Sequence, residues 1–269
     1  MEEFLSVWFV FYLVVGLLVG FLSGLVGMGG GAVIVPAMTW ALTTRGYSTE
    51  HVLHVALGTS MAAIAVVCYL SARAHAAHGA VDWGIVRRMT PGLIAGAFFG
   101  TWLARIIPTF PLAVFYAFMI CYAATNMLVQ WKPPVAGRML GWFGMFIAGF
   151  VICTLAALAA VGGAAMTIPF LAWTGVAFHT AIGTAAGVSV PLAIASAIGY
   201  IVNGLDQTGL PPMSLGYVHL PAFVGIALGS SLLSPLGARI AHRTSAIALR
   251  RIFAVLMYTI AIKLAWSLA

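Results

Sequence analysis

The chain has 269 residues, of which 63% are hydrophobic and only 6% charged, and its mean hydropathy is +1.10. Soluble domains carry about 25% charged residues, so this composition excludes a water-soluble globule, a disordered chain and a collagen-like repeat. The net charge of +7 comes from Lys and Arg that are scattered between apolar runs. A nucleic-acid-binding surface would gather them in one stripe, so we interpret them as topology signals in a lipid bilayer and expect no nucleic-acid partner.

Ten apolar segments result when the chain is cut at its charges and turn residues. A helix needs about 20 apolar residues to cross a hydrocarbon core of about 30 Å. The second and seventh segments are too short, since 14 residues reach only about 21 Å, and we expect partial helices that begin at depth in the membrane. In chain order the segments are 5 to 27, 31 to 44, 51 to 72, 84 to 107, 110 to 130, 139 to 161, 162 to 176, 179 to 202, 215 to 241 and 245 to 268.

The distribution of Lys and Arg tests whether the two short segments reverse the chain, because cytoplasmic loops carry an excess of these residues. When all ten segments count as crossings, nine of the twelve basic residues fall on one side. In the alternative with eight crossings, the loops 73 to 88 and 239 to 251 lie on opposite sides and the bias nearly disappears. We therefore predict ten crossings, with both termini outside the cytoplasm.

The two halves of the chain resemble each other. At an offset of 133 residues the run 27 to 40 aligns with 160 to 173, and at an offset of 125 the run 54 to 60 aligns with 179 to 185. A looser third match pairs Pro91, Gly96 and Gly100 with Pro221, Gly225 and Gly229. The order of these blocks indicates an internal duplication that spans nearly the whole chain.

Five segments per repeat is an odd number, so the second copy enters the membrane from the opposite face, as in many secondary transporters. We predict an all-α polytopic membrane protein with two inverted-topology repeats and short discontinuous helices after Gly-rich breaks. The first repeat is expected over 1–130, a cytoplasmic linker over 131–138 and the second repeat over 139–269.

The Gly-rich breaks before the two short helices are the predicted substrate-binding regions. Discontinuous helices of inverted repeats meet near the midplane, and a helix N-terminus offers free N–H groups and the positive end of its dipole. Two such ends favour a small anion. The alternative is that the small residues are packing notches between helices. The predicted site residues are Gly29, Gly30, Gly31, Gly58, Thr59, Ser60, Gly162, Gly163, Gly183 and Thr184.

Histidines are the titratable residues that repeat. His54 and His179 hold equivalent positions in the two halves and are candidates for gating or proton coupling, with capping of helix entrances as the alternative. The five acidic residues fall at the start or in predicted loops, so no carboxylate relay is expected in the membrane; a coupling proton or sodium ion stays open. His51 with His54 and His75 with His78 have ligand-like spacing but no Cys or carboxylate nearby, so we predict no metal and no cofactor.

An intramembrane enzyme would need a nucleophile beside a base, or a pair of membrane carboxylates. No aspartate lies in a predicted span, and Ser60 is a poor partner for His54, six residues away on the same segment. We therefore predict a secondary transporter and not an enzyme. An anion channel of the same architecture is the alternative, and a homodimer is left open.

The run 20 to 36, Gly-Phe-Leu-Ser-Gly-Leu-Val-Gly-Met-Gly-Gly-Gly-Ala-Val-Ile-Val-Pro, with Ala-Leu-Gly-Thr-Ser at 56 to 60, resembles the TauE/SafE sulfite exporter family, also called the TSUP permeases. The resemblance covers essentially the full chain. It implies a multi-pass transporter of the bacterial cytoplasmic membrane for sulfite, taurine-type sulfonates, sulfinates or sulfoacetate. It also implies that the breaks at 29 to 31 and 162 to 163 are the site regions. The second copy departs from the Gly-rich pattern at Ala160 and Ala164, which leaves open an asymmetric site or a site shaped for a bulkier organic tail.

Overall fold

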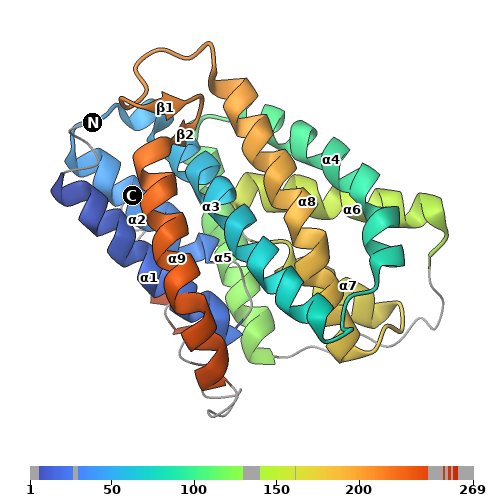
Figure 1. The fold of residues 1–269 in the computed structure, drawn as a ribbon. Coiled ribbons are helices and arrows are strands. Elements are labelled where there is room, and N and C mark those ends of the chain that lie inside the picture. Colours follow the sequence, from blue (N-terminus) through green and yellow to red (C-terminus); the bar gives the residue numbers. More distant parts are fainter. Residues whose placement is uncertain are drawn as a thin grey trace.

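The computed structural model describes residues 6–26, 30–129, 140–160, 162–241, 251, 254–255 and 257–259. Within these residues the chain forms nine α-helices and one two-stranded sheet (Figure 1). The predicted linker 131–138 lies outside the described residues, as does most of the tenth predicted segment. The elements are α1 (Val7–Val26), α2 (Gly31–Thr44), α3 (Thr49–Ala77), α4 (Trp83–Ile106), α5 (Thr109–Val129), α6 (Trp142–Ala159), α7 (Ala164–Trp173), α8 (Phe178–Gly204), β1 (Ser214–Leu215), β2 (Val218–His219) and α9 (Leu220–Ala241).

The outer surface of the helix bundle is apolar. Large apolar side chains such as Phe118, Phe143 and Leu232 are 65%, 71% and 67% exposed, whereas a soluble protein of this size leaves few such patches uncovered. Four of the described helices are long and apolar enough to cross a membrane, namely α3, α6, α8 and the Thr109–Asn126 part of α5. The prediction of a mostly helical, multi-pass membrane protein is confirmed.

The ninth predicted segment is wrong at its start. A helix was expected from 215, but residues 214 to 219 form an antiparallel β-hairpin and α9 begins at Leu220. Met213 and Gly216 have φ angles of 58° and 54°, in the left-handed region that a right-handed helix cannot accommodate. The hairpin therefore closes the end of the bundle before α9 enters it.

The directions of the helices bear on the two short segments. Gly58, in the first half of α3, packs against Tyr200 near the end of α8, and Ala80, just after the end of α3, packs against Gly183 near the start of α8. The helices α3 and α8 are therefore antiparallel. Four helices, α4 to α7, lie between them in the chain. If each of the four reverses the direction of the chain, α3 and α8 run in opposite directions, as observed. The short α7 therefore reverses the chain as the long helices do. The eight-crossing alternative would make α3 and α8 parallel.

The short helix α2 also reverses the chain. Trp8 and Phe11, near the start of α1, lie with ring centroids 6.2 and 5.4 Å from that of Trp40, near the end of α2. At the other end of the same pair, Gly30 lies against Val19. These contacts make α1 and α2 an antiparallel hairpin, in agreement with the scheme in which both short segments count as crossings.

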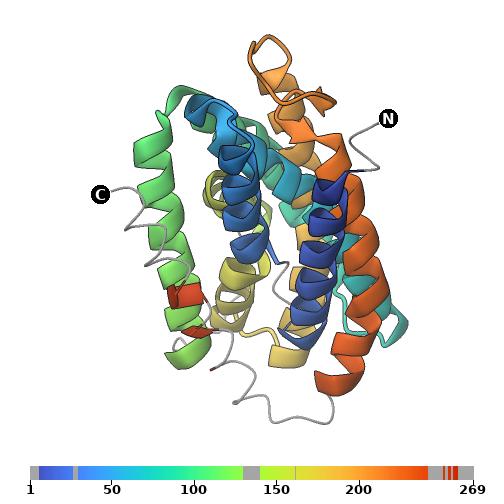
Figure 2. The same cartoon turned by 90° about the vertical axis from the view of Figure 1, so that its left-hand side faces the viewer.

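Two pairs of parallel helices pack closely through glycine. Figure 2 shows α1 and α9 side by side, and α4 packs along α6 in the same manner. Glycine lets two helix backbones approach within contact distance, as in membrane helix pairs. Each of these glycines lies against the backbone of the partner helix: Gly16 against Ile226, Gly20 against Ser230, Gly92 against Phe146 and Gly96 against Phe150.

Candidate functional site

The first break lies between α1 and α2. Gly30 is the N-cap of α2, with a φ angle of 71°, and its carbonyl oxygen accepts hydrogen bonds from the N–H groups of Val33 and Ile34 at 3.0 and 3.2 Å. Glycine adopts this left-handed conformation without the steric cost that other residues meet. Gly29 lies outside the described residues. The break thus stops α1 and starts a new helix at Gly31.

The second break has the same plan with different residues. Ala160 ends α6 with a φ angle of 43°, and Gly163 is the N-cap of α7. The N–H group of Thr167 donates to the carbonyl oxygen of Gly163 over 2.9 Å. The predicted seventh segment, 162 to 176, is therefore a helix of 10 residues from Ala164 to Trp173.

The two breaks meet inside the bundle. Gly31, the first residue of α2, lies so close to the carbonyl oxygen of Ala160 that a Cβ atom on it would overlap that oxygen. The hydroxyl of Tyr116 on α5 donates to the carbonyl oxygen of Gly31 at 3.4 Å, and the amide of Asn126 donates to the carbonyl oxygen of Ala165 at 3.2 Å. The breaks, 129 residues apart in the chain, therefore form one buried centre.

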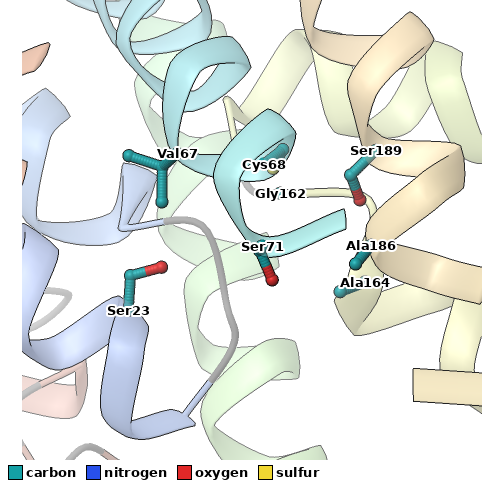
Figure 3. Close-up of a pocket in the computed structure, with 8 residues that line it drawn as sticks. All are labelled: Ser23, Val67, Cys68, Ser71, Gly162, Ala164, Ala186 and Ser189. Atoms are coloured by element: carbon teal, nitrogen blue, oxygen red, sulfur yellow. The ribbon is translucent and has the colours of Figure 1, made fainter. Parts of the chain in front are cut away.

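A small pocket opens beside the second break. Its volume of about 10 Å³ is near the minimum that holds a single water molecule, so this conformation does not hold an oxyanion there. Figure 3 shows side chains from α1, α3 and α8 around this space. The lining residues are Ser23 of α1, Val67, Cys68 and Ser71 of α3, Gly162 and Ala164 at the second break, and Ala186 and Ser189 of α8.

The polar groups of this pocket are neutral. None of the described residues that line it carries a charge, and its hydroxyls belong to Ser23, Ser71 and Ser189. The hydroxyl of Ser189 donates to the carbonyl oxygen of Ala185 at 2.8 Å, within its own helix. Beside them lies the N-terminus of α7, where the N–H groups of Ala165, Met166 and Thr167 already donate to the carbonyl oxygens of Gly162 and Gly163. What this terminus offers to an anion is therefore the positive end of the helix dipole. The chemistry suits an anion that accepts several hydrogen bonds.

Two predicted hydroxyls are engaged away from the pocket. The side-chain oxygen of Thr59 accepts a hydrogen bond from the N–H group of His219, and that of Thr184 accepts one from the N–H group of Asp82, each over 3.0 Å. Both donors belong to the segment that precedes a fourth helix of a repeat, α9 or α4. Each threonine thus holds the equivalent loop of the opposite half. The nearby Ser60 hydroxyl is fully buried and has no hydrogen-bond partner among the described residues.

Of the ten predicted site residues, Gly162 lines the pocket, and Gly163 is the next residue in the chain. Gly30 and Gly31 lie at the first break. Gly58 and Gly183 are at packing contacts, because a Cβ atom on them would overlap the carbonyl oxygens of Tyr217 and Ala80. For these two positions the packing interpretation describes the contact.

The two equivalent histidines lie in different surroundings. His54 is buried, its Nε2 atom lies 2.9 Å from the carbonyl oxygen of Ala104, and its ring stacks on Tyr217 with centroids 5.2 Å apart. His179 is exposed at the start of α8 and interacts electrostatically with His75. Neither lines the pocket. In the described part of the chain, no three His, Cys, Asp or Glu side chains cluster as metal ligands.

Sequence reasoning did not find the four polar side chains of the pocket, Ser23, Cys68, Ser71 and Ser189. Each is a single small polar residue in an apolar run. The spacing of Cys68 and Ser71, three residues apart on one segment, would have indicated a shared polar face. The asymmetry of the site follows from such residues: the offset of 125 that relates the third and eighth segments pairs Ser189 with Ile64.

Comparison with known proteins places this architecture in a family. The model of the family described as "Sulfite exporter TauE/SafE" matches residues 12–264. The chain belongs to the TauE/SafE family. A probable membrane transporter protein of Haemophilus influenzae is 33% identical over 254 residues, which cover 94% of this chain and 96% of that protein.

More distant TauE/SafE relatives carry the same description. Probable membrane transporter proteins of Bacillus subtilis and Methanocaldococcus jannaschii are 26% and 24% identical, over 77% and 87% of this chain and 85% and 86% of theirs. No solved structure matches the chain. Family membership thus supports a membrane transporter, and the resemblance found in the sequence is confirmed.

Proposed function

We propose that this TauE/SafE chain is a secondary transporter that moves small sulfur-containing anions across the cytoplasmic membrane by alternating access of two inverted repeats. The anions are sulfite, taurine-type sulfonates, sulfinates and sulfoacetate. The observation that carries the proposal is the pocket at the N-terminus of α7, beside the point where the two breaks meet. A coupling proton or sodium ion and an orientation with both termini outside are part of the proposal.

The choice of an anion rests on what surrounds the pocket. The hydroxyls of Ser23 and Ser71 and the thiol of Cys68 offer hydrogen-bond donors, and the hydroxyl of Ser189 becomes a donor to a ligand if it turns away from the carbonyl oxygen of Ala185. The acidic residues Glu50, Asp82 and Asp206 lie at or beyond helix ends. A cation in the pocket would have no carboxylate partner among the described lining residues. A tetrahedral or pyramidal oxyanion has several acceptor oxygens, which match the donors that converge from α1, α3 and α8 and the dipole of α7.

Equivalent contacts in the two halves support inverted repeats. A Cβ atom on Gly92 of α4 would meet the carbonyl oxygen of Phe146 and the nitrogen of Phe150, and one on Gly229 of α9 would meet the same two atoms of Leu13 and Leu17. Phe146 and Phe150 are the partners of Leu13 and Leu17 at the offset of 133. The fourth and first helices of opposite halves therefore pack in one register. These contacts relate Gly92 to Gly229, whereas the looser sequence match aligned Gly100 with Gly229.

The small volume of the pocket supports alternating access. A binding site that holds an oxyanion has to widen from the conformation described above and then open to one side at a time. The packed glycine contacts of α1 with α9 and of α4 with α6 are suited to rigid-body movement, because whole helix pairs can move as units. The paired helices would form the bodies that rock around α7.

The experiment is a binding screen on the purified full-length protein in lipid nanodiscs. Each of sulfite, thiosulfate, taurine, a sulfinate and ethanesulfonate is titrated into the protein, with chloride and sulfate for comparison. Calorimetry measures the binding of each anion. At least one sulfur oxyanion is expected to bind saturably and more tightly than chloride. In Ser189→Ala and Ser71→Ala, the affinity should fall about tenfold to a hundredfold, the cost of a lost hydrogen bond to a charged ligand.

The matched control is Ser231→Ala, which removes a half-buried serine hydroxyl of α9 that bonds only within its own helix, to the carbonyl oxygen of Ala227. Its affinity should equal that of the unmodified protein. If no sulfur oxyanion binds saturably, the proposed substrate class is wrong. If reconstituted protein conducts anions without saturation or coupling, the chain is an anion channel of the same architecture.

A further inference from the structure

Polar groups continue from the pocket to one end of the bundle along α3. Cys68 and Ser71, which line the pocket, are followed by His75 and His78 at spacings of four and three residues. Such spacing places side chains on one face of a helix. His75 is half-buried and lies one turn, about 6 Å, beyond Ser71 along the helix axis.

One face of α8 leads from the pocket to the same end. Ser189 and Ala186 line the pocket, and Ile182 and His179 precede them at spacings of four and three residues. Because α3 and α8 are antiparallel, the end of α3 and the start of α8 lie together at one end of the bundle (Figure 1). There His75 and His179 interact electrostatically. We call this pair the histidine entrance.

Other charges at this end add to a positive potential. Arg73 of α3 and Arg87 and Arg88 of α4 are exposed, as is His78, which also interacts electrostatically with His75. The acidic group of this region is Asp82, whose carboxylate accepts hydrogen bonds from the N–H groups of Gly84 and Ile85. Its charge is thereby held at the start of α4 and is partly balanced by that helix dipole.

We propose that the histidine entrance is an anion-binding subsite, at which protonated His75 and His179 attract the substrate. From there the substrate passes to the pocket lined by Ser23, Ser71 and Ser189, here called the serine pocket. The inference rests on the proposed function and names the side from which the pocket is reached. An imidazole side chain carries a positive charge only when it is protonated, and protonation increases as the pH falls. Affinity for an anion therefore rises as the pH falls, and it weakens as salt screens the charges.

The test uses ethanesulfonate, which stays a monoanion over the range studied, so that only the protein titrates. Calorimetric titrations of the full-length protein in nanodiscs are made between about pH 5.5 and about pH 8. Affinity is expected to be about threefold to tenfold tighter at the acidic end, the effect of one or two added charges a few ångströms away in a wet site. In the double variant H75Q/H179Q, the affinity should be weak and independent of pH.

Two further variants keep the outcome decisive. In His179→Arg the charge is permanent, so the affinity at about pH 8 should approach that of the unmodified protein at about pH 5.5. His51→Gln, at the opposite end of α3, should keep the full pH dependence. Saturable binding whose pH dependence persists in H75Q/H179Q overturns the histidine entrance and leaves the proposed function standing. Absence of binding at every pH overturns the assignment of sulfonates and the entrance together.

Discussion

Gly31 of α2 packs directly against the carbonyl oxygen of Ala160 at the end of α6, with no room for a Cβ atom between them. The two residues come from corresponding places in the two halves of the chain, since each lies at a break before a short helix. This contact joins the halves at the buried centre. The serine pocket lies directly beside it because Gly162 and Ala164 follow Ala160 in the chain.

Gly31→Ala is expected to destabilise the fold. The added methyl group meets backbone atoms of Ala160, which cannot move as a side-chain tip can, so the cost should be at least about 2 kcal/mol. The measurement is thermal unfolding in detergent together with the yield of monodisperse protein. Gly141→Ala is the control, because a Cβ atom at Gly141 has nothing within 4 Å. Equal stability of the two variants would show that the breaks are not in contact.

Thr59→Val and Thr184→Val test the equivalent hydroxyls of the two halves. Each change leaves a backbone N–H group, that of His219 or Asp82, without its acceptor. A buried unsatisfied donor costs about 1 to 3 kcal/mol, and His219 is fully buried, so Thr59→Val should lower the unfolding temperature more.

Thr44→Val is the control for this pair, since its exposed hydroxyl bonds only to the carbonyl oxygen of Trp40 in its own helix. Thermal unfolding measures all three variants. A Thr59→Val protein as stable as Thr44→Val would remove the structural role assigned to the Thr59 hydroxyl.

Cys68 reports on occupation of the serine pocket. In a variant with Cys121 and Cys153 replaced by Ala, the single thiol lines the pocket and is 7% exposed. A small thiol reagent should modify it slowly, because access requires the pocket to open, and a saturating sulfonate should slow the reaction further. The rate is followed by mass spectrometry. A sulfonate that binds but leaves the rate unchanged would place its site elsewhere.

The ion pair of Arg105 with Asp206 joins the end of α4 to the loop after α8. Its N···O distance is 2.7 Å, and the two side chains are 38% and 59% exposed. The side-chain amide of Gln207, and then Arg105, lower the pKa of Asp206 below its ordinary value. A carboxylate with a lowered folded pKa contributes stability above its unfolded pKa and loses it as the pH falls through the folded value.

Asp206→Asn should therefore lower the unfolding temperature slightly at neutral pH, because exposed pairs contribute little. The difference from the unmodified protein should vanish once the pH falls below the lowered pKa of Asp206, where its protonated carboxyl group is as neutral as the asparagine amide. Thermal unfolding as a function of pH measures this. A difference that persists in strong acid would assign the effect to the loop conformation and not to the charge.

The sequence alone predicted the helical membrane class, the two short helices and their Gly-rich breaks. These features are local: hydropathy over a window of residues fixes a membrane helix, and a glycine such as Gly30 permits a left-handed turn whatever its surroundings. The sequence did not predict the hairpin at 214 to 219. An apolar run with few charges predicts a helix, and only the φ angles of Met213 and Gly216 exclude one at this place.

Only the tertiary structure decided which residues meet at the site. Thr59 and Thr184 looked like substrate hydroxyls in the sequence, but both hold loops, whereas Ser71 and Ser189 line the pocket. A small polar residue in an apolar helix points to substrate, to a loop or to its own backbone according to the rotation of that helix and the register of its neighbours. Rotation and register are set by contacts between segments more than 100 residues apart, such as Gly31 with Ala160, and no local pattern encodes them.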